Sequence, residues 1–240
     1  MAEVHNIKVI ARLHSDFETK FGIPRQSGLV DELRSTVVFE PEYRNADAVR
    51  GLEEFSHIWL VWQFSGAVRE DWSPTVRPPR LGGNKRIGVF ATRSPFRPNA
   101  LGLSSVRLER VEYTQDLGPV LHVAGADLMD GTPVYDIKPY IAYADSHADA
   151  RGGFVDSVER RVLSVHCADE LLALVPEQKR AALLGVLAQD PRPSYQEDAE
   201  RIYGMAFAGF DVKFTVDGLC LTVRRIEKKG NSSSDPSDFT

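Results

Sequence analysis

Long apolar runs, a leader-like start and cysteine are scarce in this sequence, and each absence narrows what the chain can be. The longest apolar run, IWLVW from Ile58, has the length of a β-strand and falls far short of a membrane span. The first residues, MAEVHNIKVI, lack the basic start and apolar centre of a signal peptide. Cys167 and Cys220 are the only cysteines, so a disulfide framework is not expected. We therefore expect a cytoplasmic protein that does not engage a membrane.

Several motifs typical of common catalytic chemistries are also missing. The sequence contains no G-x-G-x-x-G, no phosphate-binding P-loop and no G-x-S-x-G nucleophile motif. Its histidines are scattered without the spacing of metal ligands, and two distant cysteines do not make a zinc site. His57 adjoins an apolar strand, where a lone histidine is more often structural than catalytic. We expect no metal site and no serine-hydrolase chemistry.

The acidic net charge conceals a basic stretch. A formal charge of −5 over 240 residues argues against nucleic-acid binding by the whole surface. Between Ser73 and Leu108, however, there is no Asp or Glu. The basic side chains of this stretch are Arg77, Arg80, Lys85, Arg86, Arg93, Arg97 and Arg107. They predict either a local anion-binding surface or a solvated face that pairs with acids elsewhere, and both interpretations remain open at this point.

Strand patterns dominate residues 1–150. Such patterns begin at Ile7, Thr36, Ile58, Arg86, Val106, Pro119 and Pro133. The run IWLVWQF is apolar on both faces and predicts a buried central strand. A slip of the apolar phase near Glu109 and Arg110 predicts a bulge, and EYRNADAVRGLEEF from Glu42 is the best candidate for a helix. Many short strands separated by Gly and Pro turns predict a closed or strongly curved sheet.

A different pattern follows a linker near residues 145–156. VERRVLSV is typical of a strand, and EQKRAALLGVLAQD from Glu177 has the apolar spacing of an amphipathic helix. Two alternating runs flank Asp217-Gly218, which is a signal for a two-residue hairpin. Residues 157–228 therefore predict a small α+β domain, and residues 229–240 a disordered tail. The predicted fold class is mainly β.

Two loops rich in Gly and Pro carry donors for an anion. In FGIPRQSGL, Pro24 fixes the backbone while Arg25 and Gln26 offer forked donors. In ATRSPFRPNALGLS, Arg93 and Arg97 can each hold a carboxylate or phosphate at two points. Taken singly, such loops are ordinary turns. Together, at the ends of predicted strands, they favour a ligand site.

A third segment, GADLMDGTPVYDIKPYI, supplies acids. Asp127 and Asp130 flank a turn, and the side chains that alternate onto one face of the next strand are Asp136, Lys138 and Tyr140. An ion pair of Asp136 with Lys138 on the surface is the alternative explanation. The apolar residues of these loops are Phe96, Leu103, Leu128 and Met129. The residues alone thus predict an anionic or zwitterionic ligand with an aromatic ring, bound in the mouth of a β-barrel.

These segments resemble the family of tRNA N6-threonylcarbamoyladenosine methyltransferases of the TrmO, or TsaA-like, type. The matching strings are PRQSGL, GLEEFSHIWLVWQF, TRSPFRPNALGLS and DLMDGTPVYDIKPYI. The later DPRPSYQEDAERIYGMAF is similar to the C-terminal domain of bacterial members. The resemblance implies a single-sheeted β-barrel over residues 1–150 that binds S-adenosylmethionine, and a homodimer with the cofactor near the subunit interface. It also implies methylation of N6 of threonylcarbamoyladenosine at position 37 of tRNA.

Carried onto matching positions, the resemblance implies a set of cofactor contacts. They are Pro24, Arg25, Gln26, Ser65, Gly66, Arg93, Leu103, Asp127, Leu128, Met129 and Asp130. Ser65 and Gly66 stand where the family commonly has a His-Gln pair. Ser65 and Gly66 lack the side chains of that pair, so the contact implied there is through the backbone.

Direct methyl transfer needs one residue to take a proton from N6, and Asp136, tuned by Lys138 or assisted by Tyr140, is the hypothesis for that base. The side chains expected to contact tRNA phosphates or the threonyl carboxylate are Arg77, Arg80, Lys85, Arg86 and Arg97. We expect the C-terminal domain to position tRNA, by elimination only. The alternatives are a non-catalytic tRNA- or nucleotide-binding barrel and a structural barrel for protein assembly. The acids beside the basic loops favour the enzyme.

Overall fold

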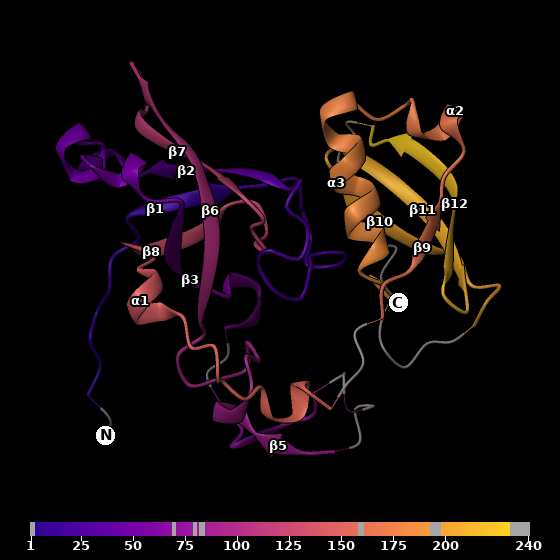
Figure 1. Ribbon diagram of the computed structural model, residues 1–240, viewed down its shortest axis with the longest axis horizontal. Coiled ribbons are helices and arrows are strands. Elements are labelled where there is room, and N and C mark those ends of the chain that lie inside the picture. The colour runs from indigo at the N-terminus through magenta and orange to yellow at the C-terminus, as the bar shows by residue number, and fades with distance from the viewer. Residues whose placement is uncertain are drawn as a thin grey trace.

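A computed structural model describes residues 3–68, 71–78, 81, 85–157, 161–192 and 198–230. It shows a β-barrel followed by a smaller sheet with a helix against it (Figure 1). The strands of the barrel are β1 (Ala11–His14), β2 (Arg34–Phe39), β3 (His57–Gln63), β6 (Leu101–Thr114), β7 (Gly118–Ala124) and β8 (Thr132–Pro139). They close in the order β1-β2-β7-β6-β3-β8. The predicted mainly β fold with a single-sheeted barrel is confirmed.

Every second side chain along a barrel strand points inward, and these side chains fill the barrel. On β3 the side chains of Ile58, Leu60 and Trp62 point inward and are buried, whereas Trp59 and Val61 between them are half-buried on the outer face. The expectation that both faces of this strand are buried is therefore wrong. A closed sheet of one layer has only one interior, and among the described residues no second sheet covers the outside of β3.

The register slip predicted in β6 is present. The pairing of β6 with β7 shifts between Leu108 and Arg110, which leaves Glu109 as the extra residue of a bulge. A second shift lies between β3 and β8, where Val61 opposes Asp136 but Trp62 opposes Val134. Bulges of this kind increase the local twist that a small closed barrel requires.

Two predicted elements of the barrel region are wrong. The stretch from Glu42 is not one helix but three 3-10 turns, η1 (Pro41–Tyr43), η2 (Ala46–Val49) and η3 (Leu52–Glu54). Asn45 caps η2 through its side chain, and Gly51 separates η2 from η3 with a φ of 82°. The strand expected from Arg86 is only β5 (Ile87–Gly88), paired with β4 (Thr75–Val76), because the chain then enters the 3-10 turn η6 (Val89–Ala91).

The C-terminal part is a four-stranded sheet with helices. Its elements are β9 (Ser164–His166), α2 (Asp169–Leu172), α3 (Glu177–Ala188), β10 (Tyr203–Phe207), β11 (Phe210–Asp217) and β12 (Cys220–Lys228). The predicted helix from Glu177 is confirmed, and so is the hairpin, although its two turn residues are Gly218 and Leu219. The strand expected around VERRVLSV is short, and residues 158–160 of it lie outside the described part. Between barrel and sheet lie α1 (Ala142–Asp145) and the 3-10 turn η7 (Gly153–Val155).

The connection between β1 and β2 (residues 15–33) belongs to the core of the C-terminal sheet. Phe17 packs edge-on against Phe207 with ring centroids 5.5 Å apart. Lys179 Nζ of α3 lies 2.6 Å from Asp16 Oδ2, and the backbone N–H of Ala208 donates to the Asp16 carbonyl at 2.9 Å. The segment that contains PRQSGL is therefore held on one side by the barrel and on the other by the C-terminal domain.

No described helix is long and apolar enough to cross a membrane. Among the described residues, no group of His, Cys, Asp and Glu side chains is arranged to hold a metal ion.

Candidate functional site

The three polar connections leave the barrel at the same rim. They are residues 15–33 between β1 and β2, residues 64–100 between β3 and β6, and residues 125–131 between β7 and β8. The register places the ends of β1 and β3 beside the start of β8, since Leu13 opposes Thr132 and Trp62 opposes Val134. Segments far apart in sequence therefore meet, because in an antiparallel pair the end of one strand lies beside the start of its neighbour.

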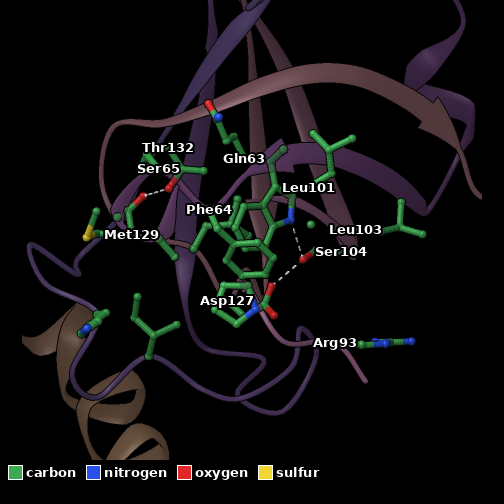
Figure 2. A pocket seen from close by; sticks show the side chains of 18 of the residues that line it. Gln63, Phe64, Ser65, Arg93, Leu101, Leu103, Ser104, Asp127, Met129 and Thr132 are labelled. Atoms are coloured by element: carbon green, nitrogen blue, oxygen red, sulfur yellow. Dashed lines mark hydrogen bonds between the residues drawn. The ribbon is translucent and has the colours of Figure 1, made fainter. Parts of the chain in front are cut away.

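A cavity of about 1140 Å³ opens between these connections. Its wall is formed by parts of residues 18–26, 62–68, 90–104 and 127–132. Figure 2 shows Ser104 joined to Asp127 inside it, with Phe64 nearby, and Leu103 and Arg93 farther out. Its volume is slightly larger than that of typical pockets for small ligands, so it has room for one ligand and for part of a second.

Main-chain hydrogen bonds fasten two of the connections to each other. Gly28 N donates to the Gly125 carbonyl at 2.8 Å, and Asp130 N donates to the Phe17 carbonyl at 2.8 Å. A Cβ on Gly125 would lie 3.3 Å from the Gly28 backbone, and its φ of 75° disfavours other residues as well. The two segments are thus positioned by backbone contacts, which suits a site that must hold its shape.

A chain of hydrogen bonds leads from the barrel interior to a carboxylate in the cavity wall. Trp62 Nε1 donates to Ser104 Oγ at 3.0 Å, and Ser104 Oγ donates to Asp127 Oδ1 at 2.6 Å. Trp62 is 7% exposed and Ser104 2%, so water cannot easily replace either bond. We call these three residues the Trp62–Ser104–Asp127 chain.

Gly102 makes room for this chain. A Cβ at Gly102 would lie 2.3 Å from Cε2 of the Trp62 indole, its partner across the β3–β6 pair. The loop that contains RSPFRPNALG therefore needs a glycine so that the indole can lie over it. The Trp62 indole makes the close approach to the backbone that this glycine permits.

The electrostatics of Asp127 are unusual for a surface acid. Burial raises the pKa of the Asp127 carboxyl above its ordinary value, while the Ser104 hydrogen bond and the positive charge of Arg93 partly oppose the rise. A carboxylate that has lost much of its hydration gains from a cationic partner. Asp127 is therefore suited to bind a positively charged group in the cavity.

Most of the residues implied as cofactor contacts are brought together here. All of them except Asp130 line the cavity. Arg93 donates from Nη1 to the side-chain oxygen of Gln26, which joins the connections 15–33 and 64–100. Asp130 instead accepts from the Ser15 backbone N–H at 3.1 Å and lies 3.1 Å from His14 Nδ1. The structure thus places Asp130 outside the cavity, at the end of β1.

The residues expected to take the proton lie elsewhere. Asp136 and Lys138 form an ion pair of 2.9 Å on the outer face of the barrel, and the Tyr140 ring packs against Trp59 at 5.6 Å. None of the three lines the cavity. Asp136 lies farther along β8 than Thr132, which lines the cavity, and it opposes Val61 on the outer face of β3.

The predicted RNA contacts lie in the connection between β3 and β6. Arg97 lines the cavity and donates to the Thr92 carbonyl at 3.1 Å, and Arg86 donates to Thr75 Oγ1 at 3.0 Å across the β4–β5 pair. Arg77 directly follows β4, and Lys85 precedes Arg86. Arg80 lies outside the described residues.

Sequence reasoning missed Trp62 and Ser104. The signal was present in the alternation of LGLSSV, which places Gly102, Ser104 and Val106 on one face. A serine on the inward face of a barrel strand indicates a buried hydrogen bond, because an unpaired hydroxyl there is costly. Its partner Asp127 is 23 residues away in sequence, so only the closed barrel reveals the contact.

Comparisons with known proteins agree with this architecture. The description "tRNA-methyltransferase O N-terminal domain" matches residues 12–146, and "TrmO C-terminal domain" matches residues 161–229. The tRNA (adenine(37)-N6)-methyltransferase of Escherichia coli K12 is 41% identical over 228 residues, which cover 92% of this chain and 97% of that protein. A Pseudomonas aeruginosa protein provisionally named S-adenosylmethionine-dependent methyltransferase RcsF is 42% identical over 215 residues, or 87% of this chain and 91% of that protein.

Solved structures give the same result for the fold. The crystal structure of TrmO from Pseudomonas aeruginosa superposes with a TM-score of 0.77 at 33% identity. The match covers 94% of this chain and 99% of that one.

Proposed function

The chain belongs to the tRNA-methyltransferase O family, and we propose that it transfers a methyl group from S-adenosylmethionine to N6 of adenosine 37 in tRNA. We further propose that the accepted form of this nucleoside carries the threonylcarbamoyl group. The observation that carries the proposal is the Asp127 carboxylate, which is desolvated, held by Ser104 and faces a cavity with an arginine and apolar walls.

The cavity residues fit S-adenosylmethionine by their chemistry. That molecule combines an aromatic base with a sulfonium, an ammonium and a carboxylate. Asp127 suits a cationic group, Arg93 suits a carboxylate, and the apolar surfaces of Phe64 and Leu103 suit the base. The cavity volume of about 1140 Å³ leaves room for a target nucleoside beside it.

When bound, S-adenosylmethionine supplies a methyl group that the positive sulfur has already activated. The residues of the protein must therefore exclude water, align the methyl group with N6 and accept one proton. Connections 15–33 and 125–131, which backbone hydrogen bonds fasten together, supply the alignment. Asp136 remains our proposal for the base, with Lys138 and Tyr140 beside it.

The position of Asp136 makes a specific demand on the assembly. Because Asp136 lies on the outer face of the barrel, general-base action requires either a second copy across this face or a substrate that extends over the rim. The same face exposes Leu103 by 55% and leaves Trp59 and Val61 half-buried, which supports a homodimer through β3, β6 and β8. Asp136→Asn should then lower methyl transfer by roughly 10²–10⁴. A loss below about tenfold, or an equal loss in the control Asp217→Asn, removes the base role.

We propose that tRNA phosphates contact the basic connection, chiefly Arg77, Lys85, Arg86 and Arg97. In that case the affinity for tRNA falls steeply as salt rises, and a salt-insensitive complex would contradict this part of the proposal. Arg80 belongs to the same expectation but lies outside the described residues. A tRNA substrate and the free cysteines support the cytoplasmic location expected from the sequence.

The C-terminal domain is proposed to help position tRNA. Lys213, Arg224 and Arg225 point from the uncovered face of its sheet, opposite the core. Lys213 and Arg225 already pair with Asp211 and Glu227, so this surface is less basic than the connection between β3 and β6.

The test is a mass measurement on nucleosides. The purified chain is incubated with S-adenosylmethionine and tRNA that carries threonylcarbamoyladenosine, and the digested RNA is weighed. One added methyl group on that nucleoside, with none added to the unmodified transcript, is the expected result. No mass gain while tRNA still binds would instead favour the non-catalytic binding module.

A further inference from the structure

Two aromatic side chains lie together in solvent in the connection between β3 and β6. Trp72 is 52% exposed and Phe90 is 71% exposed, yet their ring centroids are 6.0 Å apart at an interplanar angle of 33°. Phe90 also lines the cavity, so the pair stands at its mouth. Scattered exposed apolar residues are normal, but a paired aromatic patch at the edge of a ligand cavity indicates a partner.

The pair is presented by a fixed piece of backbone. Val89, next to Phe90, is only 1% exposed, and its N–H donates to the Pro74 carbonyl at 2.9 Å. Thr92 donates from Oγ1 to the Val89 carbonyl at 2.8 Å and closes the η6 turn. Because Val89 is buried and the turn is closed by hydrogen bonds, the backbone of the turn itself directs Phe90 toward solvent.

The chemistry around the pair favours a polyanion with flat apolar faces. Trp72 and Phe90 flank one end of the β4–β5 ribbon, and Arg77 and Arg86 flank the other end. No acidic residue occurs from Ser73 to Leu108, although the exposed Asp71 directly precedes Trp72. Single-stranded RNA offers phosphates for the arginines and base faces for the rings, whereas a protein surface rarely offers both in succession.

We propose that Trp72 and Phe90 form a stacking platform for the anticodon-loop bases that neighbour the methylated adenosine. This inference rests on the proposed function. A base that enters the cavity must leave its stack, and its neighbour at the mouth then loses a partner. An aromatic ring at the mouth replaces that partner and accepts any base, because every base has a π face.

The experiment measures tRNA affinity without S-adenosylmethionine, by fluorescence anisotropy of a labelled tRNA over a series of salt concentrations. We expect Trp72→Ala and Phe90→Ala each to weaken binding by about tenfold, with the salt slope unchanged, since stacking releases no counterions. Arg86→Ala should instead reduce the slope by about 1. Trp72→Phe should retain most of the affinity. The matched control is Tyr113→Ala, which is 53% exposed near the far end of β6.

Several results would overturn the inference. Binding within twofold of wild type in both alanine variants, or a salt slope changed as in Arg86→Ala, would exclude stacking. An alanine variant that also loses S-adenosylmethionine affinity by calorimetry, or that turns a dimer into a monomer, would assign the pair to the cavity wall or to an interface between copies. A wild-type chain that binds tRNA through the pair but adds no methyl group would refute the proposed function and leave the platform standing.

Discussion

Ser104→Ala removes the one hydroxyl that joins Trp62 in the barrel interior to Asp127 in the proposed cofactor site, and it should weaken both stability and cofactor binding. Ser104 Oγ accepts from Trp62 Nε1 at 3.0 Å and donates to Asp127 Oδ1 at 2.6 Å. The substitution removes both bonds and changes little volume. Trp62 then has a buried N–H without a partner, and Asp127 loses the largest interaction that opposes the rise of its pKa.

The size of the effect follows from what each group loses. A buried donor without a partner costs about 1–3 kcal/mol, so the free energy of unfolding should fall by about that amount. A hydrogen bond to a charged group contributes about 1.5–3 kcal/mol, and every 1.4 kcal/mol is about tenfold in affinity. If Asp127 binds the cationic part of S-adenosylmethionine, affinity should fall by about 10- to 100-fold. The affinity should also begin to fail at a higher pH than in wild type, because the carboxylate is harder to ionise.

Isothermal titration calorimetry with S-adenosylmethionine, over a series of pH values, measures both effects, and urea denaturation measures stability. The control is Ser105→Ala, one residue along the same strand but on the outer face, opposite Trp59. Wild-type affinity and an unchanged pH profile in Ser104→Ala, with the expected loss of stability, would refute the reasoning. The Trp62–Ser104–Asp127 chain would then be structural only.

Three further predictions concern the same site. Gly102→Ala should destabilise the chain by about 1–3 kcal/mol in urea denaturation, because its Cβ would lie 2.3 Å from the Trp62 indole. In wild type, affinity for S-adenosylmethionine should fall as pH falls through the raised pKa of Asp127, since only the ionised carboxylate attracts a cation; Asp127→Asn should bind weakly at every pH, and a wild-type-like slope in calorimetry would refute the assignment. Phe207→Ala should cost about 3–5 kcal/mol and also weaken cofactor binding, because Phe207 packs on Phe17 of the connection that holds Gln26; unchanged calorimetric affinity would show that the C-terminal domain does not hold that connection.

The sequence predicted elements where a local pattern decides the structure. Helix α3 and the β11–β12 hairpin have strong local signals, and the bulge at Glu109 follows from a phase slip that can be read directly. The 42–55 stretch misled because its apolar spacing resembles a helix, whereas Asn45 and Gly51 divide it into short turns. Apolar content alone also could not tell that β3 has one buried face, since that depends on closure of the sheet.

The sequence predicted the loops that form the candidate site, but not where the proposed base Asp136 and the buried Ser104 lie relative to it. The loops with Arg25, Arg93 and Asp127 meet at one rim because antiparallel pairing places the end of one strand beside the start of its neighbour. This pairing depends on the topology of the barrel and cannot be read from the spacing of residues in the sequence. Asp136 and Asp127 belong to the same sequence motif, but Asp136 lies on β8 with its side chain on the outer face of the barrel. Ser104 was missed because its partner is brought near only by the closed barrel.

The central claim is that S-adenosylmethionine binds in the barrel-rim cavity with a cationic group against Asp127. The most direct measurement is a crystal structure of the chain with S-adenosylmethionine. We expect electron density for the ligand between residues 18–26, 62–68, 90–104 and 127–132, with its sulfonium or ammonium in contact with Asp127. Density at another place, such as the C-terminal sheet, or a ligand in the cavity with its carboxylate facing Asp127, would contradict the account.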